Sequence, residues 1–182
     1  MDIVEIRHLK KYFKDGSQVV KALDGIDLSI KKGKFTVIVG ASGSGKTTLL
    51  NMIAGLYEPD EGTVIVDGLN LSKMEEEQLT IFRRRKIGFV FQGYNLIPEL
   101  TIRENIVFPL ALDDTQPDAA YFSNLVHLLG LDNYLKVRPH MLSGGAQQCA
   151  AIARALITKP SIVLADEPTG SLDMKTAQNV AG

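Results

Sequence analysis

Residues 40–47 read Gly40-Ala41-Ser42-Gly43-Ser44-Gly45-Lys46-Thr47. This octapeptide fits the pattern G-x-x-x-x-G-K-[ST], in which backbone N–H groups surround phosphate oxygens and the lysine reaches the β- and γ-phosphates. The apolar run at 35–39 predicts a buried strand before the loop, and residues 48–54 predict a helix after it. Such a helix presents unpaired amides and a positive dipole end to an anion. An accidental glycine-rich turn is the alternative, and the flanking elements argue against it. We therefore predict a nucleotide site here.

The composition is that of an ordinary soluble protein. The chain has 182 residues, 45% hydrophobic and 23% charged, which suits one domain with room for a subdomain. Its formal net charge of −1 argues against general binding of nucleic acid. The short run Arg83-Arg84-Arg85-Lys86 is interpreted as a solvated helix end. The single cysteine, Cys149, excludes an intramolecular disulfide and suits a reducing compartment. With no signal peptide and no apolar run long enough to span a membrane, we expect a cytoplasmic protein.

The order of the predicted elements indicates an α/β fold. Residues 3–6 predict a short strand, and the alternation of Ile26, Leu28 and Ile30 predicts a half-buried, antiparallel strand. Further strands are predicted at 63–66, 87–91 and 161–165, with a helix over 75–86. We therefore expect a P-loop NTPase core with a mainly parallel sheet and an N-terminal antiparallel β part.

Between residues 93 and 142 the pattern changes to helices joined by polar loops. Thr101 and Glu104 have the spacing of a capping box, Pro117 falls where a helix could start, and Gly130 falls where one could stop. This region predicts a helical subdomain inserted into the α/β core. We expect a single domain over 1–182, with 1–92 and 151–182 as the catalytic core and 93–150 as the helical subdomain.

A second glycine-containing stretch, Ser143-Gly144-Gly145, precedes another predicted helix. The apolar residues of this helix have the spacing of a core stripe, formed by Cys149, Ile152, Ala153, Leu156 and Ile157. Serine is a favoured N-cap, and the two small residues expose amides at the helix N-terminus.

Two adjacent acids, Asp166 and Glu167, follow the apolar strand predicted at 161–165. Ligands of parallel sheets bind at the carboxyl ends of the strands, so Asp166 could hold Mg²⁺ together with the Thr47 hydroxyl. Glu167 would then be placed to polarise an attacking water as general base. A solvated turn is the plainer alternative, and the phosphate loop earlier in the chain argues against it.

These motifs together resemble the ATPase domain of ABC transporters. The resemblance runs from about residue 3 to 177 and rests on the phosphate loop, Gln92, Leu142-Ser143-Gly144-Gly145, Asp166-Glu167 and Ser171-Leu172-Asp173. Lys86-Ile87-Gly88-Phe89-Val90-Phe91-Gln92 and Asn95-Leu96-Ile97-Pro98 resemble most the ATPases of lipoprotein-release, macrolide and antimicrobial-peptide export systems.

The resemblance implies a role for each motif. Gln92 is expected to contact Mg²⁺ or water beside the catalytic Glu167 and Lys46, and Asp173 is expected at the dimer contact. ATP is expected on residues 40–47 and Thr48, with the metal on Thr47, Gln92 and Asp166. Ser143, Gly144 and Gly145 are expected to touch the γ-phosphate held by the opposite subunit. Either Phe13 or Tyr12 is expected to stack on adenine, and either ring could equally serve packing.

Three features depart from the family pattern. Ala146 stands where the signature motif usually continues with glutamine, which predicts weaker contact with the partner's nucleotide. Cys149 replaces the usual arginine and is interpreted as a packing residue. The family places another strand and a switch histidine after the residues near Asp173, whereas His8, His127 and His140 all lie upstream. We therefore expect either a truncated domain or slow hydrolysis, because losing one stabilising group costs about 10²–10³ in rate.

Two functions follow from these expectations. In the first, two copies sandwich two Mg-ATP and drive export or extraction by a separate membrane permease, on the cytoplasmic face of the membrane. In the second, the chain is a nucleotide-binding module or a fragment that hydrolyses little ATP and acts as a switch. A P-loop kinase or a DNA-handling ATPase is a third class, opposed by the signature motif and by the neutral charge balance.

Overall fold

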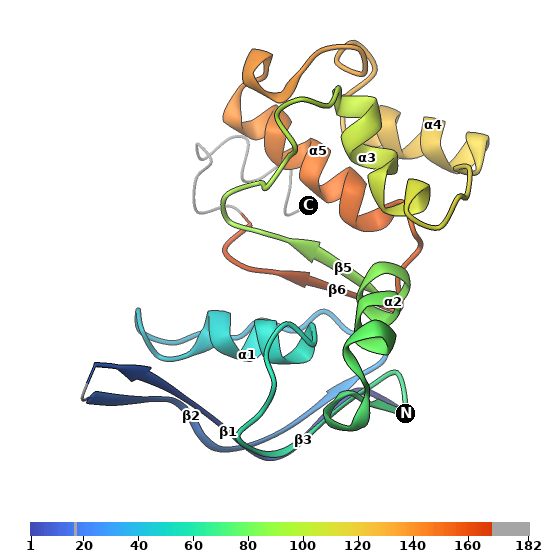
Figure 1. The fold of residues 1–182 in the computed structure, drawn as a ribbon. Helices are drawn as coiled ribbons and strands as arrows, with labels where there is room; N and C mark the ends of the chain where they lie inside the picture. The colour runs from blue at the N-terminus through green and yellow to red at the C-terminus, as the bar shows by residue number, and fades with distance from the viewer. Residues whose placement is uncertain (17, 169–182) are drawn as a thin grey trace. The chain divides into compact units, whose positions relative to one another are not determined.

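The computed structural model describes residues 1–16 and 18–168. The chain divides into two compact units, 1–83 and 84–182, and each is described by itself (Figure 1). Within the described residues, none of the helices combines the length and the apolar character needed to cross a membrane. The motif Ser171-Leu172-Asp173 lies outside the described residues.

The first unit is built on a four-stranded antiparallel sheet in the order β2-β1-β3-β4 (Figure 1). Its strands are β1 (Asp2–Asp15), β2 (Gln18–Lys31), β3 (Glu61–Val66) and β4 (Leu69–Asn70). Val4 lies opposite Ile30 on one side and Val66 on the other. The antiparallel N-terminal part is therefore confirmed. However, β1 is longer than the predicted strand, since its polar second half pairs with the start of β2 and satisfies its backbone groups there.

Helix α1 (Lys46–Ile53) packs on the strands of this sheet and closes the core of the first unit. Met52 and Ile53 on the helix are buried, as are Leu9, Leu23 and Val64 on the sheet. Because α1 begins at Lys46, this packing fixes the end of the phosphate loop to the sheet. The helix predicted over 48–54 is confirmed and begins two residues earlier.

The buried strand predicted at 35–39 is wrong. The segment has no strand conformation, and the exposed fractions of Phe35, Val37 and Val39 are 95%, 66% and 85%. Alternating apolar residues favour a strand, but a strand also needs a neighbour that pairs with its N–H and C=O groups. Among the described residues, neither sheet contains this segment.

A 3₁₀ turn, η1 (Leu71–Lys73), leads to helix α2 (Glu76–Lys86), which confirms the helix predicted over 75–86. The basic residues at the end of α2 form more contacts within the protein than the residues of a solvated helix end would. Arg83 donates to the carbonyl oxygen of Gly55 over 2.8 Å. Arg84 and Arg85 both form ion pairs with Asp113, at 2.5 and 2.8 Å.

Within residues 84–168, the second unit contains a parallel pair of strands and the helices α3, α4 and α5 (Figure 1). Strand β5 (Ile87–Val90) pairs with β6 (Ile162–Ala165), so that Val90 lies opposite Ala165. The helices are α3 (Ile102–Ala111), α4 (Ala119–Leu128) and α5 (Gly144–Leu156), with a 3₁₀ turn η2 (Pro139–Met141) before α5. The strands expected near 87–91 and 161–165 are confirmed.

The helices of this unit share one apolar core. It includes Ile106 of α3, Val126 of α4 and Ala153 of α5. The capping box of α3 is confirmed, because Thr101 and Glu104 each accept from the other's backbone N–H. Gly130 follows the end of α4 with φ +66°, as expected of a helix stop.

The predicted stripe on α5 is only partly right. Ala153 and Ile157 are buried, whereas Cys149, Ile152 and Leu156 are half-buried, and α5 also buries Gln148, Ala150, Ala151 and Ala155. The helix therefore buries more than one face, which a single-stripe pattern does not foresee. Cys149 packs against the apolar core, in agreement with a packing role, and burial raises the pKa of its thiol.

Candidate functional site

The phosphate loop, residues 40–47, runs into α1 in a conformation that depends on its glycines. Gly43 and Gly45 have φ of +77° and +89°. A Cβ on Gly45 would lie 2.4 Å from the carbonyl oxygen of Ala22 in β2, so only glycine fits without moving backbone. Ser44 N donates to the Ala41 carbonyl over 3.2 Å and closes a turn within the loop. The loop is therefore wound tightly and set against β2.

Lys46 is folded back over the loop that precedes it. Its Nζ donates to the carbonyl oxygens of Gly40 and Ala41, both at 2.9 Å. Gly45 is the N-cap of α1 and supplies no side-chain acceptor for the first amides of the helix. Those amides, the helix dipole and the ammonium group together form a setting that favours an anion.

The other residues of the loop are accessible. Gly40, Ala41, Ser42, Gly43, Ser44 and Thr47 are exposed, and Gly45, Lys46 and Thr48 are half-buried. A cavity of about 270 Å³ lies beyond the other end of α1, where its lining includes Met52, Val64 and Leu79. That cavity contains none of the residues predicted for the nucleotide site.

The structure separates the two candidate aromatic residues of β1. The Tyr12 hydroxyl donates to Asp24, and Lys21 Nζ lies 5.3 Å from the centre of its ring. This hydrogen bond raises the pKa of Tyr12. Tyr12 is therefore occupied by contacts within the β1–β2 hairpin.

Phe13 lies differently. Its ring packs edge-on against Tyr57, with 5.6 Å between ring centres, and Tyr57 follows the helix that the phosphate loop begins. Val20, opposite Phe13 on β2, is 52% exposed. Lys11 Nζ lies 5.6 Å from the centre of the Phe13 ring, so this ring also has a cation beside it. An aromatic pair with an accessible side is the kind of surface on which a base stacks.

In the second unit, Gln92 and the two acids come together. Strands β5 and β6 end side by side, and Asp166 N donates to the Val90 carbonyl over 3.0 Å. Gln92 Nε2 donates to Glu167 Oε2 over 3.0 Å. Glu167 has φ +45°, an unusual backbone conformation for a glutamate. Parallel pairing thus places a carboxamide and two carboxylates at one edge of the sheet.

The donor atoms suit magnesium, a hard cation that prefers oxygen ligands and keeps several waters or phosphate oxygens. The hydroxyl of Thr47, the carboxylate of Asp166 and the amide oxygen of Gln92 are of this type. Within residues 1–16 and 18–168, no group of three or more His, Cys, Asp and Glu side chains could hold a metal ion.

The N-terminus of α5 has the geometry expected of Ser143-Gly144-Gly145. Ser143 is the N-cap, and its Oγ accepts from Ala146 N at 3.4 Å. Gly144 is closely approached by Tyr94, whose hydroxyl oxygen would lie 2.8 Å from a Cβ at this position. Ala146 is half-buried against the apolar core, which gives the departure from glutamine a packing role.

The predicted residues fall into two groups. The phosphate loop and the two aromatic residues belong to the first unit, and Gln92, Ser143-Gly144-Gly145 and Asp166-Glu167 belong to the second. The structure brings Gln92 and Glu167 into contact within the second unit. Each of the two groups is described here within its own unit.

Sequence reasoning missed two residues that shape the second group. Arg154 of α5 donates to the carbonyl oxygens of Tyr94 and Asn95, close behind Gln92 in the chain. Asn105 of α3 is fully buried, and its side chain bonds to both the N–H and the C=O of Ile97. The sequence feature that could have identified Arg154 is a charged arginine among the alanines of an apolar helix.

Comparison with known proteins gives a family. The family model described as "ABC transporter" matches residues 23–170. The ABC transporter ATP-binding protein YxdL of Bacillus subtilis is 45% identical over 98% of this chain and 70% of its own length. The lipoprotein-releasing system ATP-binding protein LolD of Shewanella frigidimarina is 41% identical over 98% of this chain and 75% of its own.

A solved structure agrees with these relatives. The ATP-binding cassette MJ0796 of Methanocaldococcus jannaschii, in a dimeric post-hydrolysis state bound to ADP and Pi, superposes with a TM-score of 0.89. It is 40% identical in sequence, and the match covers 97% of this chain and 79% of the cassette. The structural match confirms the expected P-loop NTPase fold of the α/β class.

Proposed function

The chain belongs to the ABC transporter family, and from this premise we propose that it is an ATPase subunit whose hydrolysis of ATP powers a separate membrane permease. ATP binds at the phosphate loop, where the amides of α1 and the ammonium of Lys46 hold the β- and γ-phosphates. Phe13 supports the adenine ring. LolD and YxdL, both named as ATP-binding proteins, support this assignment.

The observation that carries the proposal is the contact between Gln92 and Glu167. A general base must be held in one orientation to take a proton from water. The Gln92 amide donates to one carboxylate oxygen of Glu167 and leaves the second oxygen to act on a water molecule. Gln92 thus orients the base that takes a proton from the water molecule as this water attacks the γ-phosphate.

Thr47, Asp166 and the amide oxygen of Gln92 would hold Mg²⁺ beside the nucleotide. When bound, the ion neutralises charge on the β- and γ-phosphates. The residues of the chain do the rest: Lys46 binds the phosphates, Glu167 accepts the proton of the attacking water, and Gln92 keeps Glu167 in place.

The second half of the site comes from another copy of the chain. Ser143, Gly144 and Gly145 present the uncovered amides of α5 to the γ-phosphate that the opposite subunit holds. The dimeric cassette MJ0796 supports this arrangement. The permease anchors the dimer to the cytoplasmic face of the membrane. The predicted organisation into a core, 1–92 and 151–182, and a helical subdomain, 93–150, remains part of this proposal.

The alternative of a binding module with little turnover is not favoured. It rests on Ala146, which stands where the signature motif usually continues with glutamine. The ADP- and Pi-bound state of the related cassette is named as post-hydrolysis, which supports turnover in the family.

Phosphate release from Mg-ATP by the purified chain tests the proposal. We expect release by the wild type and by Lys34→Ala, a control at an exposed lysine near the loop. Lys46→Ala should lose most affinity for ATP and with it the activity, because it lacks the cation that faces the phosphates. Unchanged ATP binding by Lys46→Ala would contradict the site. Tight ATP binding by the wild type without phosphate release would instead favour the binding module.

A further inference from the structure

The loop that follows Gln92 has a strained backbone. Tyr94 and Asn95 have φ of +60° and +50°. Asparagine adopts this left-handed region fairly often, whereas a bulky tyrosine rarely does. Two such residues in succession persist only where the surroundings hold them.

Arg154 of α5 is the group that holds this loop. Its Nη1 donates to the carbonyl oxygen of Asn95 at 2.5 Å, and its Nη2 donates to that of Tyr94 at 2.8 Å. The planar fork of a guanidinium group matches two neighbouring acceptors. Burial lowers the pKa of this side chain, in keeping with a cation placed to bond backbone rather than to meet solvent.

The same loop also touches the other end of α5. The Tyr94 hydroxyl lies so close to Gly144 that a Cβ on Gly144 would be 2.8 Å from it. Gly144 is the first residue of α5, and Arg154 lies in its last turn. The loop is therefore fixed to α5 near both ends of the helix.

We propose that Arg154 and Tyr94 are positioning residues that join the loop after Gln92 to α5, so that Gln92 and the amides of Gly144 and Gly145 move as one body. The functional part of this inference rests on the proposed function, in which Gln92 orients the base and α5 faces the partner's nucleotide. Because of this connection, the position of Gln92 in one nucleotide site depends on the position of α5, which faces the nucleotide of the other site.

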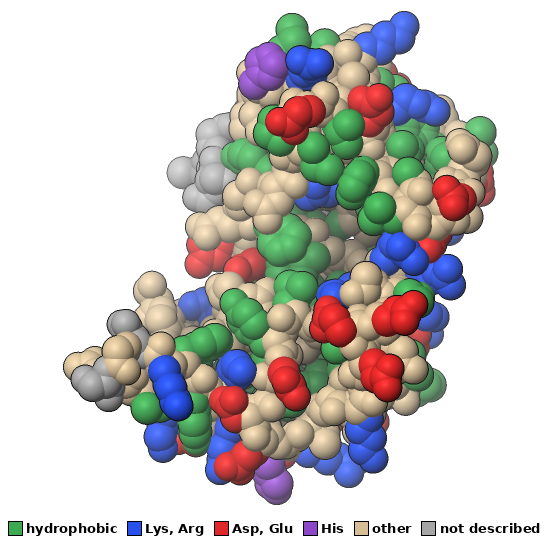
Figure 2. Space-filling model, in the orientation of Figure 1, with side chains coloured by type: hydrophobic (Ala, Val, Ile, Leu, Met, Phe, Trp, Pro, Cys, Tyr) green, Lys and Arg blue, Asp and Glu red, His purple; other side chains and the backbone are tan. Residues whose placement is uncertain are grey.

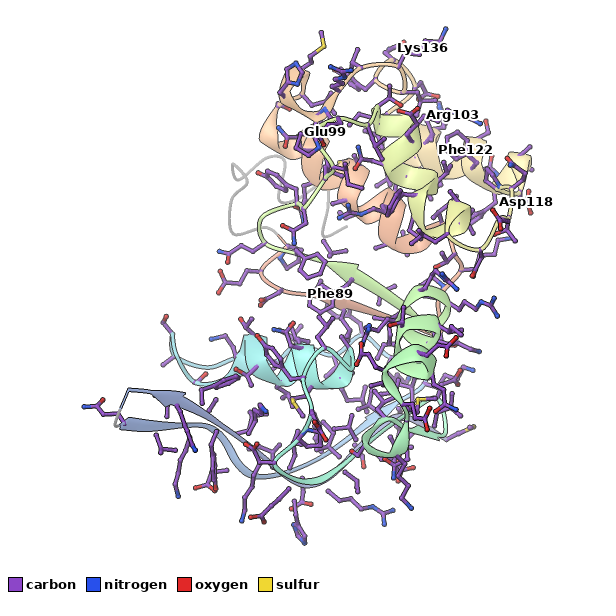
Figure 3. The ribbon with its side chains drawn as sticks, in the orientation of Figure 1. Phe89, Glu99, Arg103, Asp118, Phe122 and Lys136 are labelled. Carbon is purple, nitrogen blue, oxygen red and sulfur yellow. The ribbon has the colours of Figure 1, made fainter. Side chains whose placement is uncertain are left out.

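Arg154→Met and a matched control, Arg103→Met, test the proposal. Arg103 of α3 lies 4.7 Å from the centre of the Phe122 ring, in the same unit (Figure 3). For each variant we would measure hydrogen exchange of the amides of residues 93–97, kcat and KM for ATP, and the fluorescence of a labelled ATP bound to the monomer.

Arg154→Met should raise the exchange rate of residues 93–97 and lower kcat, each by about tenfold, a typical size for coupling between sites. KM and ATP affinity should change less than about twofold, because the phosphate loop is untouched. Arg103→Met should resemble the wild type. Arg154→Lys keeps the positive charge but lacks the planar guanidinium group, so its exchange rate and its kcat should fall between those of the two methionine variants. If Arg154→Met does not fold, Arg154→Lys serves as the test.

Faster exchange with unchanged kcat, or lower kcat with unchanged exchange, would overturn the proposal, as would an Arg154→Met protein that behaves like Arg103→Met. A wild type that binds ATP but hydrolyses none would refute the proposed function instead. In that case, hydrogen exchange of the amides of residues 93–97 would still show whether Arg154 holds the loop.

Discussion

Gln92 and Glu167 lie 75 residues apart in sequence and are joined by a hydrogen bond of 3.0 Å from Nε2 to Oε2. The contact exists because β5 and β6 pair in parallel and end together, with Val90 opposite Ala165. A carboxamide after one strand and a carboxylate after the other therefore meet at the same edge. Neither residue is buried, so the contact lies where a nucleotide and water can reach it.

Replacing Gln92 with alanine should slow hydrolysis far more than it weakens ATP binding. The base loses the donor that orients it, and misplacing a catalytic group by about 1 Å costs up to about 100-fold in rate. Steady-state kinetics should show lower kcat with little change in KM. Gln78→Ala serves as the control, because Gln78 is an exposed residue that caps the start of α2. A Gln92→Ala enzyme with wild-type kcat would remove the positioning role.

Phe13→Ala should weaken ATP binding, whereas Tyr12→Ala should not. Stacking on an aromatic ring contributes about 1–3 kcal/mol per base, so the Kd for ATP should rise by about 5- to 150-fold. Tyr12 is held by Asp24 and Lys21 within the hairpin. Calorimetric titration with ATP measures both variants. A larger loss for Tyr12→Ala would reverse the assignment.

Gly45→Ala should destabilise the first unit more than Gly68→Ala does. Both glycines have a positive φ, +89° and +79°. A Cβ at Gly68 meets nothing within 4 Å, so that variant bears only the backbone strain of about 1–2 kcal/mol. At Gly45 the Cβ would also lie 2.4 Å from the Ala22 carbonyl oxygen. Urea denaturation of the two proteins gives the comparison, and equal midpoints would contradict the close contact.

Gln148→Met should stabilise the second unit by about 1 kcal/mol, because burying an amide without partners costs about 1–3 kcal/mol. Gln148 is fully buried, and neither its Oε1 nor its Nε2 has a hydrogen-bond partner within the described chain. Methionine has a similar length and no such groups to satisfy. Thermal unfolding is the measurement, with Gln147→Met as a control at a half-buried glutamine that does bond to Leu142. A lower melting temperature for Gln148→Met would mean that the amide has a use in the fold.

Local signals predicted much of this molecule. The phosphate loop, the capping box of Thr101 and Glu104, and the helix stop at Gly130 each depend on residues within a few positions of one another. These are the features that a pattern in sequence can specify, since the atoms that interact are neighbours in the chain.

Features that depend on distant partners were predicted less well. The alternation at 35–39 favours a strand but cannot supply the neighbour that a strand requires. The sequence of the basic run before β5 predicts a solvated helix end, whereas Asp113 pairs with both Arg84 and Arg85. Arg154 was missed because its acceptors, two carbonyl groups about 60 residues away, carry no side-chain signal.

Figure 2 shows acidic and basic side chains interspersed over the face in view, without a broad patch of either sign.

The most direct test of the account is phosphate release by Glu167→Gln, measured beside Glu99→Gln, a control at an exposed glutamate of the same unit. Glutamine keeps an oxygen for the Gln92 amide but cannot take a proton from water. The account predicts that Glu167→Gln binds ATP as the wild type does and releases phosphate at least about 100-fold more slowly. Phosphate release at the wild-type rate by Glu167→Gln would contradict the assignment of the base and the reaction built on it.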